Sequence, residues 1–225
     1  MYDWDFVGLE DFLVAHPRIR ISAIDDELLV LEGEYHLRAQ LAGSGLIDRD
    51  YRLKLICPRD YPKKLPTVID EEKYFPRNQK YHTYADGSFC LGSELKIKSL
   101  LRGDRSLKAF FGRIVDRFLY AVTHCIEYGN FPYGELAHGE QGLVDDYGKM
   151  LELSGKLAVT RALRALGKRK RVANKLPCPC GCGLRLGRCS YRFFLSDSRD
   201  IERRRWFRHH LKESFKPIRK SEKVK

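Results

Sequence analysis

The chain has 225 residues, 43% of them hydrophobic and 12% aromatic, which is the composition of a folded globular protein. No apolar run reaches the length of a membrane-spanning helix, and the first residues, MYDWDFVGLEDF, have neither the basic leader nor the apolar centre of a secretory signal. These features argue against a membrane protein, and we expect a cytoplasmic location.

The charge is unevenly distributed along the chain. Residues 156–225 hold 22 Lys and Arg but only five Asp and Glu, a net charge of +17. Because the whole chain carries +12, residues 1–155 carry −5. This asymmetry predicts that the tail meets an acidic partner, although a solvated basic face would have the same composition.

The periodicity predicts helices and strands in separate blocks. A short helix is expected over residues 8–17, then a strand hairpin from residues 27–42 and 51–58, and a third strand at 67–70. Helical spacing follows over 106–124, with Ser106 or Asp104 as the cap, and over 139–166, with a break near Gly155. A basic amphipathic segment covers 199–215. The predicted class is therefore α+β with an antiparallel sheet.

The best domain boundary is the charged segment GKRKRVANKLP, which contains few large apolar residues. It predicts a first domain over residues 1–167, a basic linker over 168–175 and a small module over 176–225.

Cys90 is the candidate nucleophile of the first domain. Residues 74–92 show no helical or strand period, and a long irregular stretch inside a domain is usually functional. Asp86-Gly87 predicts a tight turn that would bring Cys90 to the surface, where His82 and Lys80 could supply positive potential. The alternative is that Cys90 packs in the core, as we expect for Cys57 and Cys125.

The motifs around Cys90 resemble the ubiquitin-conjugating enzyme (E2) family over roughly Leu9 to Leu153. Tyr61, Pro62 and Pro66 match the family's YPxxxP segment, and DGSFCL, from Asp86 to Leu91, matches the turn that carries its catalytic cysteine. The resemblance implies an E2-like (UBC) core with an N-terminal helix, an antiparallel meander and C-terminal helices. It also implies that Cys90 carries a ubiquitin-like or other C-terminal carboxylate as a thioester.

One departure concerns His82, which stands where the family has the Asn of a His-Pro-Asn motif. That Asn supports the oxyanion or the local loop, and a histidine could donate a hydrogen bond there or act as a general acid or base. Lys80-Tyr81-His82 and residues 131–147 are more similar to bacterial E2-like proteins of antiphage defence operons, of the cyclic-oligonucleotide (CBASS) or ubiquitin-like conjugation type.

The resemblance therefore implies a ubiquitin-like protein or a CBASS nucleotidyltransferase as target. No ATP-binding glycine loop is evident, so we expect no nucleotide cofactor and activation of the acyl group by a separate E1-like protein.

The tail sequence CPCGCGLRLGRC predicts a structural zinc site, since four cysteines this close together in a reducing compartment favour tetrahedral thiolate binding. It resembles the SEC-C motif, in which Cys178 and Cys180 match the first pair and Cys189 the third ligand. The fourth ligand would fall at Ser190, so we infer that Cys182 replaces it, with His209 or His210 as the alternative. Free thiols are the other interpretation of the cluster.

Basic residues surround this module and predict a binding surface for a partner protein or for nucleic acid. The candidates are Arg185, Arg188, Arg203, Arg204 and Arg205. Trp206 and Phe207 lie among them and could stack on bases or pack in a core.

Four functions remain open at this stage. The first is an E2-like transferase acting through Cys90. The second is a catalytically silent E2-like binding module, and the third is a nucleic-acid or partner binder acting through the tail. A thiol protease would need a base such as His82, His124 or His138.

Overall fold

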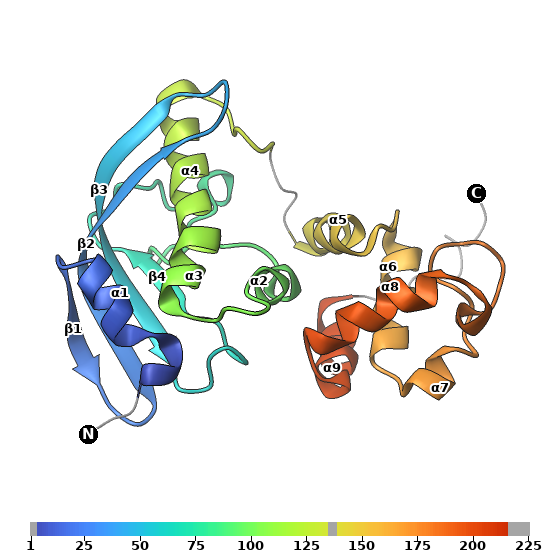
Figure 1. The fold of residues 1–225 in the computed structure, drawn as a ribbon. Helices are drawn as coiled ribbons and strands as arrows, with labels where there is room; N and C mark the ends of the chain where they lie inside the picture. The colour runs from blue at the N-terminus through green and yellow to red at the C-terminus, as the bar shows by residue number, and fades with distance from the viewer. Residues whose placement is uncertain (1–3, 135–138, 216–225) are drawn as a thin grey trace. The chain divides into compact units, whose positions relative to one another are not determined.

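The computed structural model describes residues 4–134 and 139–215 and has mixed α+β architecture (Figure 1). The chain forms two compact units, Met1–Glu135 and Leu136–Lys225. The strands all belong to the first unit: β1 (Ile19–Ile24), β2 (Leu28–Gln40), β3 (Leu46–Pro58) and β4 (Thr67–Asp70). Its helices are α1 (Leu9–Ala15), α2 (Glu94–Leu100), α3 (Leu107–Phe110) and α4 (Asp116–Tyr128), with short turns η1 (Asp5–Val7), η2 (Gln79–Tyr81) and η3 (Phe111–Val115).

The four strands form one antiparallel sheet in the order β1-β2-β3-β4. The predicted hairpin is confirmed as β2 and β3, which pair along their whole length, and the third predicted strand is β4. Strand β1 was not expected. Its central residues are exposed and a bulge interrupts its pairing between Ile21 and Ala23, so it lacks the alternation that identifies a strand in sequence.

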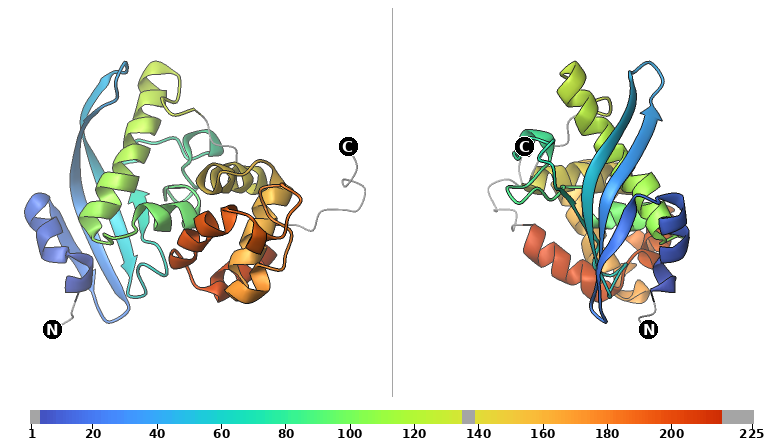
Figure 2. Two further views of the ribbon diagram at one scale, coloured as in Figure 1. Left: turned by 45° about the vertical axis from the view of Figure 1, so that its right-hand side comes forward. Right: turned by 90° about the vertical axis from the view of Figure 1, so that its left-hand side faces the viewer.

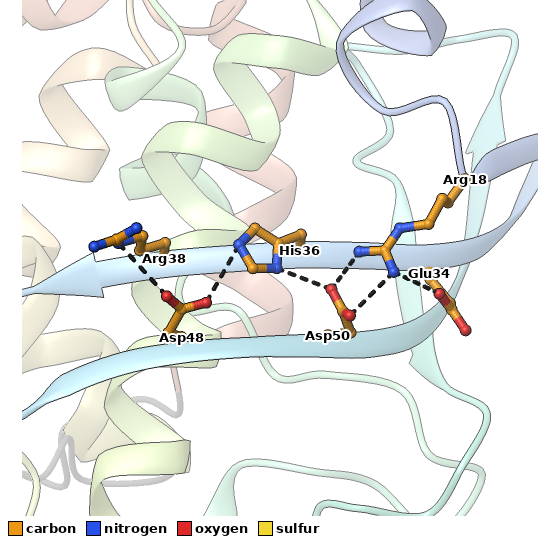
Figure 3. Close-up of polar contacts among 6 residues, drawn as sticks. All are labelled: Arg18, Glu34, His36, Arg38, Asp48 and Asp50. Carbon is orange, nitrogen blue, oxygen red and sulfur yellow. Dashed lines mark hydrogen bonds and ion pairs between the residues drawn. The ribbon is translucent and has the colours of Figure 1, made fainter.

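The two faces of the hairpin differ sharply. Alternate residues such as Tyr35 and Tyr51, which are partners in the register, are buried on one face. The other face carries a row of polar side chains that Figure 3 shows, in which acidic residues alternate with arginine and histidine; most are 43–50% exposed and Arg38 is 70% exposed. Its members are Arg18, Glu34, His36, Arg38, Asp48 and Asp50. Exposed pairs of this kind contribute little each, so the row mainly keeps this face soluble.

Helix α4 covers the buried face of the hairpin (Figures 1 and 2). The predicted helix over residues 106–124 is continuous from α3 through the π-turn η3 to α4. Ser106 caps it, because its side chain accepts a hydrogen bond from the backbone N–H of Ala109, an interaction typically contributing about 1 kcal/mol. Tyr35 packs against Phe111, and its hydroxyl donates to Asp116 Oδ1 over 2.6 Å.

The second unit is helical in the residues that the structure describes. Its elements are α5 (Gly139–Leu151), α6 (Lys156–Leu166), α7 (Lys170–Ala173), η4 (Leu186–Arg188), α8 (Tyr191–Asp197), η5 (Ser198–Asp200) and α9 (Arg204–Ser214). The predicted break near Gly155 is confirmed between α5 and α6. The Tyr191 hydroxyl donates to the Leu151 carbonyl over 2.6 Å and ties α8 to the end of α5.

The division between the units differs from the predicted boundary. Helices α5 and α6 were assigned to the first domain, but α6 packs against both α5 and α9 and belongs to the second unit. The predicted linker 168–175 contains helix α7 and lies inside that unit. Ala173 is the one buried residue of helix α7, and the charged side chains around it face solvent. The composition of this surface segment is therefore similar to that of a linker.

Candidate functional site

Cys90 ends a small hairpin that extends the sheet beyond β4. The N–H of Phe89 donates to the Val68 carbonyl over 2.9 Å, and the N–H of Asp70 donates to the Gly87 carbonyl over 3.0 Å. Across the hairpin, Thr83 pairs with Phe89. The otherwise irregular stretch before Cys90 is therefore held by backbone hydrogen bonds to the edge of the sheet.

Asp86-Gly87 forms the turn of this hairpin, as the sequence predicts. The Asp86 carboxylate accepts hydrogen bonds from the N–H and the hydroxyl of Ser88, and these bonds lower the pKa of Asp86. Gly87 has a φ of +87°, and a Cβ atom there would lie 3.0 Å from the Asp70 carbonyl oxygen. Only glycine fits both the conformation and the close approach.

Phe89 anchors the hairpin in the core of the first unit. Its ring stacks on Phe118 of α4 with 4.3 Å between centroids and meets Phe75 edge-on at 5.2 Å. Successive residues of an extended chain point to opposite sides. With Phe89 buried, Cys90 is directed away from the core and is only half-buried.

The Cys90 side chain lines an open groove of about 460 Å³. The groove is bounded by residues that precede and begin β4, by the hairpin and by α2, and its lining includes Lys63, Lys64, Leu65, Pro66, Thr67, Tyr84, Leu91, Glu94 and Ile97. The walls combine apolar side chains with two lysines, so an extended, partly apolar chain terminus could lie beside the sulfur.

Tyr84 lines the same groove as Cys90, and the sequence analysis did not identify it as a site residue. A hydrogen bond to Cys90 raises the pKa of the Tyr84 hydroxyl, with the charge of the thiolate and burial as further causes. Tyr84 is 56% exposed, so its hydroxyl is accessible from the solvent side of the groove. The sequence could have indicated Tyr84, because it lies six residues before Cys90 on the other side of the Asp86-Gly87 turn.

His82 lies opposite Cys90 in the hairpin. Its carbonyl accepts the Cys90 N–H over 2.7 Å, and its backbone has a φ of +51°, which few residues other than glycine adopt. The imidazole meets the Phe131 ring at 6.0 Å, and His82 is not among the residues that line the groove. The structure thus brings the His82 backbone to Cys90.

The remaining candidates of the first unit are buried. Cys57 and Cys125 are 0% and 4% exposed, as predicted, and burial raises the pKa of the Cys57 thiol to about 12. His124 is also buried, with Nδ1 at 2.9 Å from the Asn130 carbonyl oxygen. His138, and with it part of the stretch 131–147, lies outside the described residues.

In the second unit, the four tail cysteines converge. The sulfurs of Cys178, Cys180, Cys182 and Cys189 all lie within 4.8 Å of one another and form no disulfide. The Cys178–Cys180 and Cys180–Cys189 sulfurs are 3.2 and 3.7 Å apart. Four sulfurs bonded tetrahedrally to zinc at about 2.3 Å are separated by about 3.8 Å, so this group could hold a zinc ion.

Two glycines make the convergence possible. Gly181 and Gly183 have φ values of +81° and +78°, and the N–H of Cys178 donates to the Leu184 carbonyl to close the loop over 2.8 Å. The turn η4 then leads to Cys189. Cys182 therefore joins the cluster, as inferred from the SEC-C resemblance.

The alternative histidine ligands do not join the four sulfurs in the structure. His210 Nε2 lies 2.8 Å from the Tyr147 hydroxyl, and its ring stacks on Trp206. His209 is exposed on α9, which begins beyond the cluster.

The predicted basic residues separate into two places. Arg185 and Arg188 are exposed beside the cysteine cluster. Arg203, Arg204 and Arg205 instead line a groove with residues of α6, α7 and η5.

Within the described ranges no helix is both long and apolar enough to cross a bilayer. Comparisons with known protein families, with curated proteins and with solved structures each found no match.

Proposed function

We propose that this protein is an E2-like acyl carrier and transferase. Cys90 accepts the activated C-terminal carboxylate of a ubiquitin-like or target protein as a thioester and passes it to an acceptor. The observation that carries the proposal is the position of Cys90: a half-buried sulfur at the end of a core-anchored hairpin, lining an open groove. The E2-like core and the place in bacterial antiphage defence rest on the sequence resemblance.

The chemistry needs a group that both attacks and leaves well, and a thiolate does both. In the first step the Cys90 sulfur attacks the activated carbonyl carbon, forming the C–S bond as the bond to the donor's leaving group breaks. In the second step an amine attacks the thioester carbon, Cys90 leaves as a thiolate and the amine loses a proton. Neither step requires a strong base beside the sulfur if the acyl group arrives activated.

Tyr84 and His82 would assist in different ways. The interaction with Cys90 that raises the pKa of the Tyr84 hydroxyl keeps this hydroxyl protonated, and in the proposed reaction it would donate to the sulfur. His82 holds the hairpin through its left-handed backbone and its bond to the Cys90 N–H. This supports a loop-shaping role for His82 at the position of the family's Asn.

The silent binding module is the alternative, because His82 replaces that Asn. The protease hypothesis is less favoured, since His124 is buried on its own hydrogen bond and the His82 ring packs on Phe131. A hydrolase would need one of these rings, or that of His138, at the sulfur as a base.

The test uses a peptide α-thioester ending in glycine as acyl donor and free lysine as acceptor, followed by intact-protein mass spectrometry. We expect a reducible adduct on the wild type that is discharged by lysine, an ester on Cys90→Ser and none at this position in Cys90→Ala. Cys125→Ala is the control for loss of a thiol. An undiminished adduct in Cys90→Ala would assign the nucleophile elsewhere, and a loaded thioester that lysine never discharges would favour the silent module.

A further inference from the structure

The second unit contains a groove whose walls are almost entirely cationic. It has a volume of about 720 Å³ and lies where the end of α6, the start of α7, η5 and the start of α9 meet. The lining residues are Leu166, Arg169, Lys170, Arg199, Glu202, Arg203, Arg204, Arg205 and Arg208. Seven of these nine side chains are positive and one is negative.

Two of the guanidinium groups are fixed by the hydrogen bonds that they donate to carbonyl oxygens at the end of helix α6. Arg199 donates to the carbonyls of Ala165, Leu166 and Lys168 at 2.9–3.2 Å, and Arg208 donates to the Gly167 carbonyl over 3.0 Å. Cations are stabilised at this negative end of the helix dipole. The wall of the groove is therefore preorganised and does not depend on flexible surface side chains alone.

Glu202 brings one negative charge against seven positive side chains, so the groove stays strongly cationic. Glu202 uses one carboxylate oxygen to accept the N–H of Arg203 over 2.9 Å at the start of α9. Arg169, Lys170, Arg203, Arg204 and Arg205 are exposed to solvent around it. A concave wall of like charges concentrates positive potential and attracts a multiply charged anion.

We propose that this groove binds the sugar–phosphate backbone of nucleic acid. Guanidinium groups match phosphate oxygens in pairs, and several side by side match successive phosphates of one strand. None of the described residues that line the groove has an aromatic ring on which a base could stack, which disfavours a mononucleotide and favours contacts with the backbone.

The neighbouring aromatic residues support this distinction. Phe207 is buried, and the Trp206 ring stacks on His210 with 4.4 Å between centroids and 12° between planes. These rings, which the sequence offers as stacking platforms, pack within the unit instead. Binding would therefore be steeply salt-dependent and indifferent to base sequence. It is independent of acyl transfer at Cys90.

The test measures binding of the full-length protein to fluorescein-labelled duplex DNA of mixed sequence by anisotropy over a series of salt concentrations. The key variant is Arg204→Ala/Arg205→Ala, and its matched control is Arg185→Ala/Arg188→Ala, which removes the same charge from exposed arginines outside the groove. Losing two phosphate contacts should weaken binding roughly tenfold at low salt and reduce the slope of log K against log salt by about 2. The control should keep the wild-type slope.

A second variant, Arg169→Ala/Lys170→Ala, tests the lining at the start of α7 and should reproduce the slope change, even if the α9 variant proves unstable in thermal melts. Equal weakening by the groove variants and the control would mean diffuse attraction and would overturn the proposal. So would tighter binding of ATP than of an oligonucleotide, or equally tight binding of polyglutamate, because either result would assign the groove to another class of ligand.

Discussion

The pair of Tyr35 and Asp116 gives the sharpest test of the first unit's core. The Tyr35 hydroxyl donates to the half-buried Asp116 carboxyl over 2.6 Å and joins strand β2 to helix α4. Burial raises the pKa of Asp116 above its usual 3.8, while the hydrogen bond from Tyr35 lowers it in part. The perturbations are Tyr35→Phe, which removes the donor, and Asp116→Asn, which removes the charge but keeps an acceptor oxygen.

The expected magnitudes follow from the charge on the acceptor. At pH 7, Tyr35→Phe leaves a partly buried carboxylate without its donor, which should lower the free energy of unfolding by about 2 kcal/mol. At a pH below the usual value of 3.8 the acid is neutral in both states, and the loss should be about 1 kcal/mol. Asp116→Asn should be as stable as the wild type or more stable at pH 7, because no charge is desolvated.

The sign of the pH dependence is fixed by the raised pKa. The folded state holds the Asp116 proton more tightly than the unfolded state does, so it binds more protons at pH values between the two pKa values. This group therefore contributes stability at low pH that is lost as the pH rises from about 3.8 through the raised folded pKa. In Asp116→Asn this contribution to the pH dependence should be absent.

The assay is urea unfolding of the full chain followed by tryptophan fluorescence. The chain has two tryptophans, Trp4 in the first unit and Trp206 in the second, so a Trp206→Phe background makes Trp4 the reporter of the first unit. Measurements at about pH 3, 5.5 and 7 cover both sides of the usual value of 3.8 and give the pH dependence for each variant. If Tyr35→Phe costs the same at every pH, or if Asp116→Asn is strongly destabilised at pH 7, then the Asp116 carboxylate is not held as described.

Two further perturbations test the candidate sites. Gly87→Ala should lower the free energy of unfolding by about 1–2 kcal/mol more than Gly43→Ala, because both glycines have positive φ but only Gly87 lacks room for a Cβ. The shifted turn should also slow alkylation of Cys90 by iodoacetamide. Equal losses of stability in the two variants would contradict the close approach of Gly87 to Asp70. Cys182→Ser should lower the zinc content measured by mass spectrometry of the purified protein and make the second unit more sensitive to chelators, whereas Cys125→Ser, which changes a buried thiol of the first unit, should not. A Cys182→Ser protein that keeps the full zinc content would remove Cys182 from the ligand set.

Local sequence patterns were sufficient for much of the fold. The alternation in β2 and β3 marks a sheet with one buried face, and the apolar spacing of residues 106–124 marks the helix that covers it. The Asp86-Gly87 turn and the four clustered cysteines could also be predicted, because glycine conformation and thiol spacing act over a few residues. These features depend on neighbours in the chain.

Other features depend on contacts between distant residues, and only the tertiary structure decided them. The groove that Tyr84 and Cys90 both line depends on the anchoring of the hairpin through Phe89 on Phe118, a residue of helix α4 far along the chain. The arginines of α9 share a groove with Arg169 and Arg199 because α9 packs against α6, whereas Arg185 and Arg188 lie outside that groove. The sequence by itself thus determines which turns, helices, strands and reactive side chains are present. Long-range packing determines which of these side chains share a groove, because residues far apart in sequence meet only when buried surfaces bring their elements together.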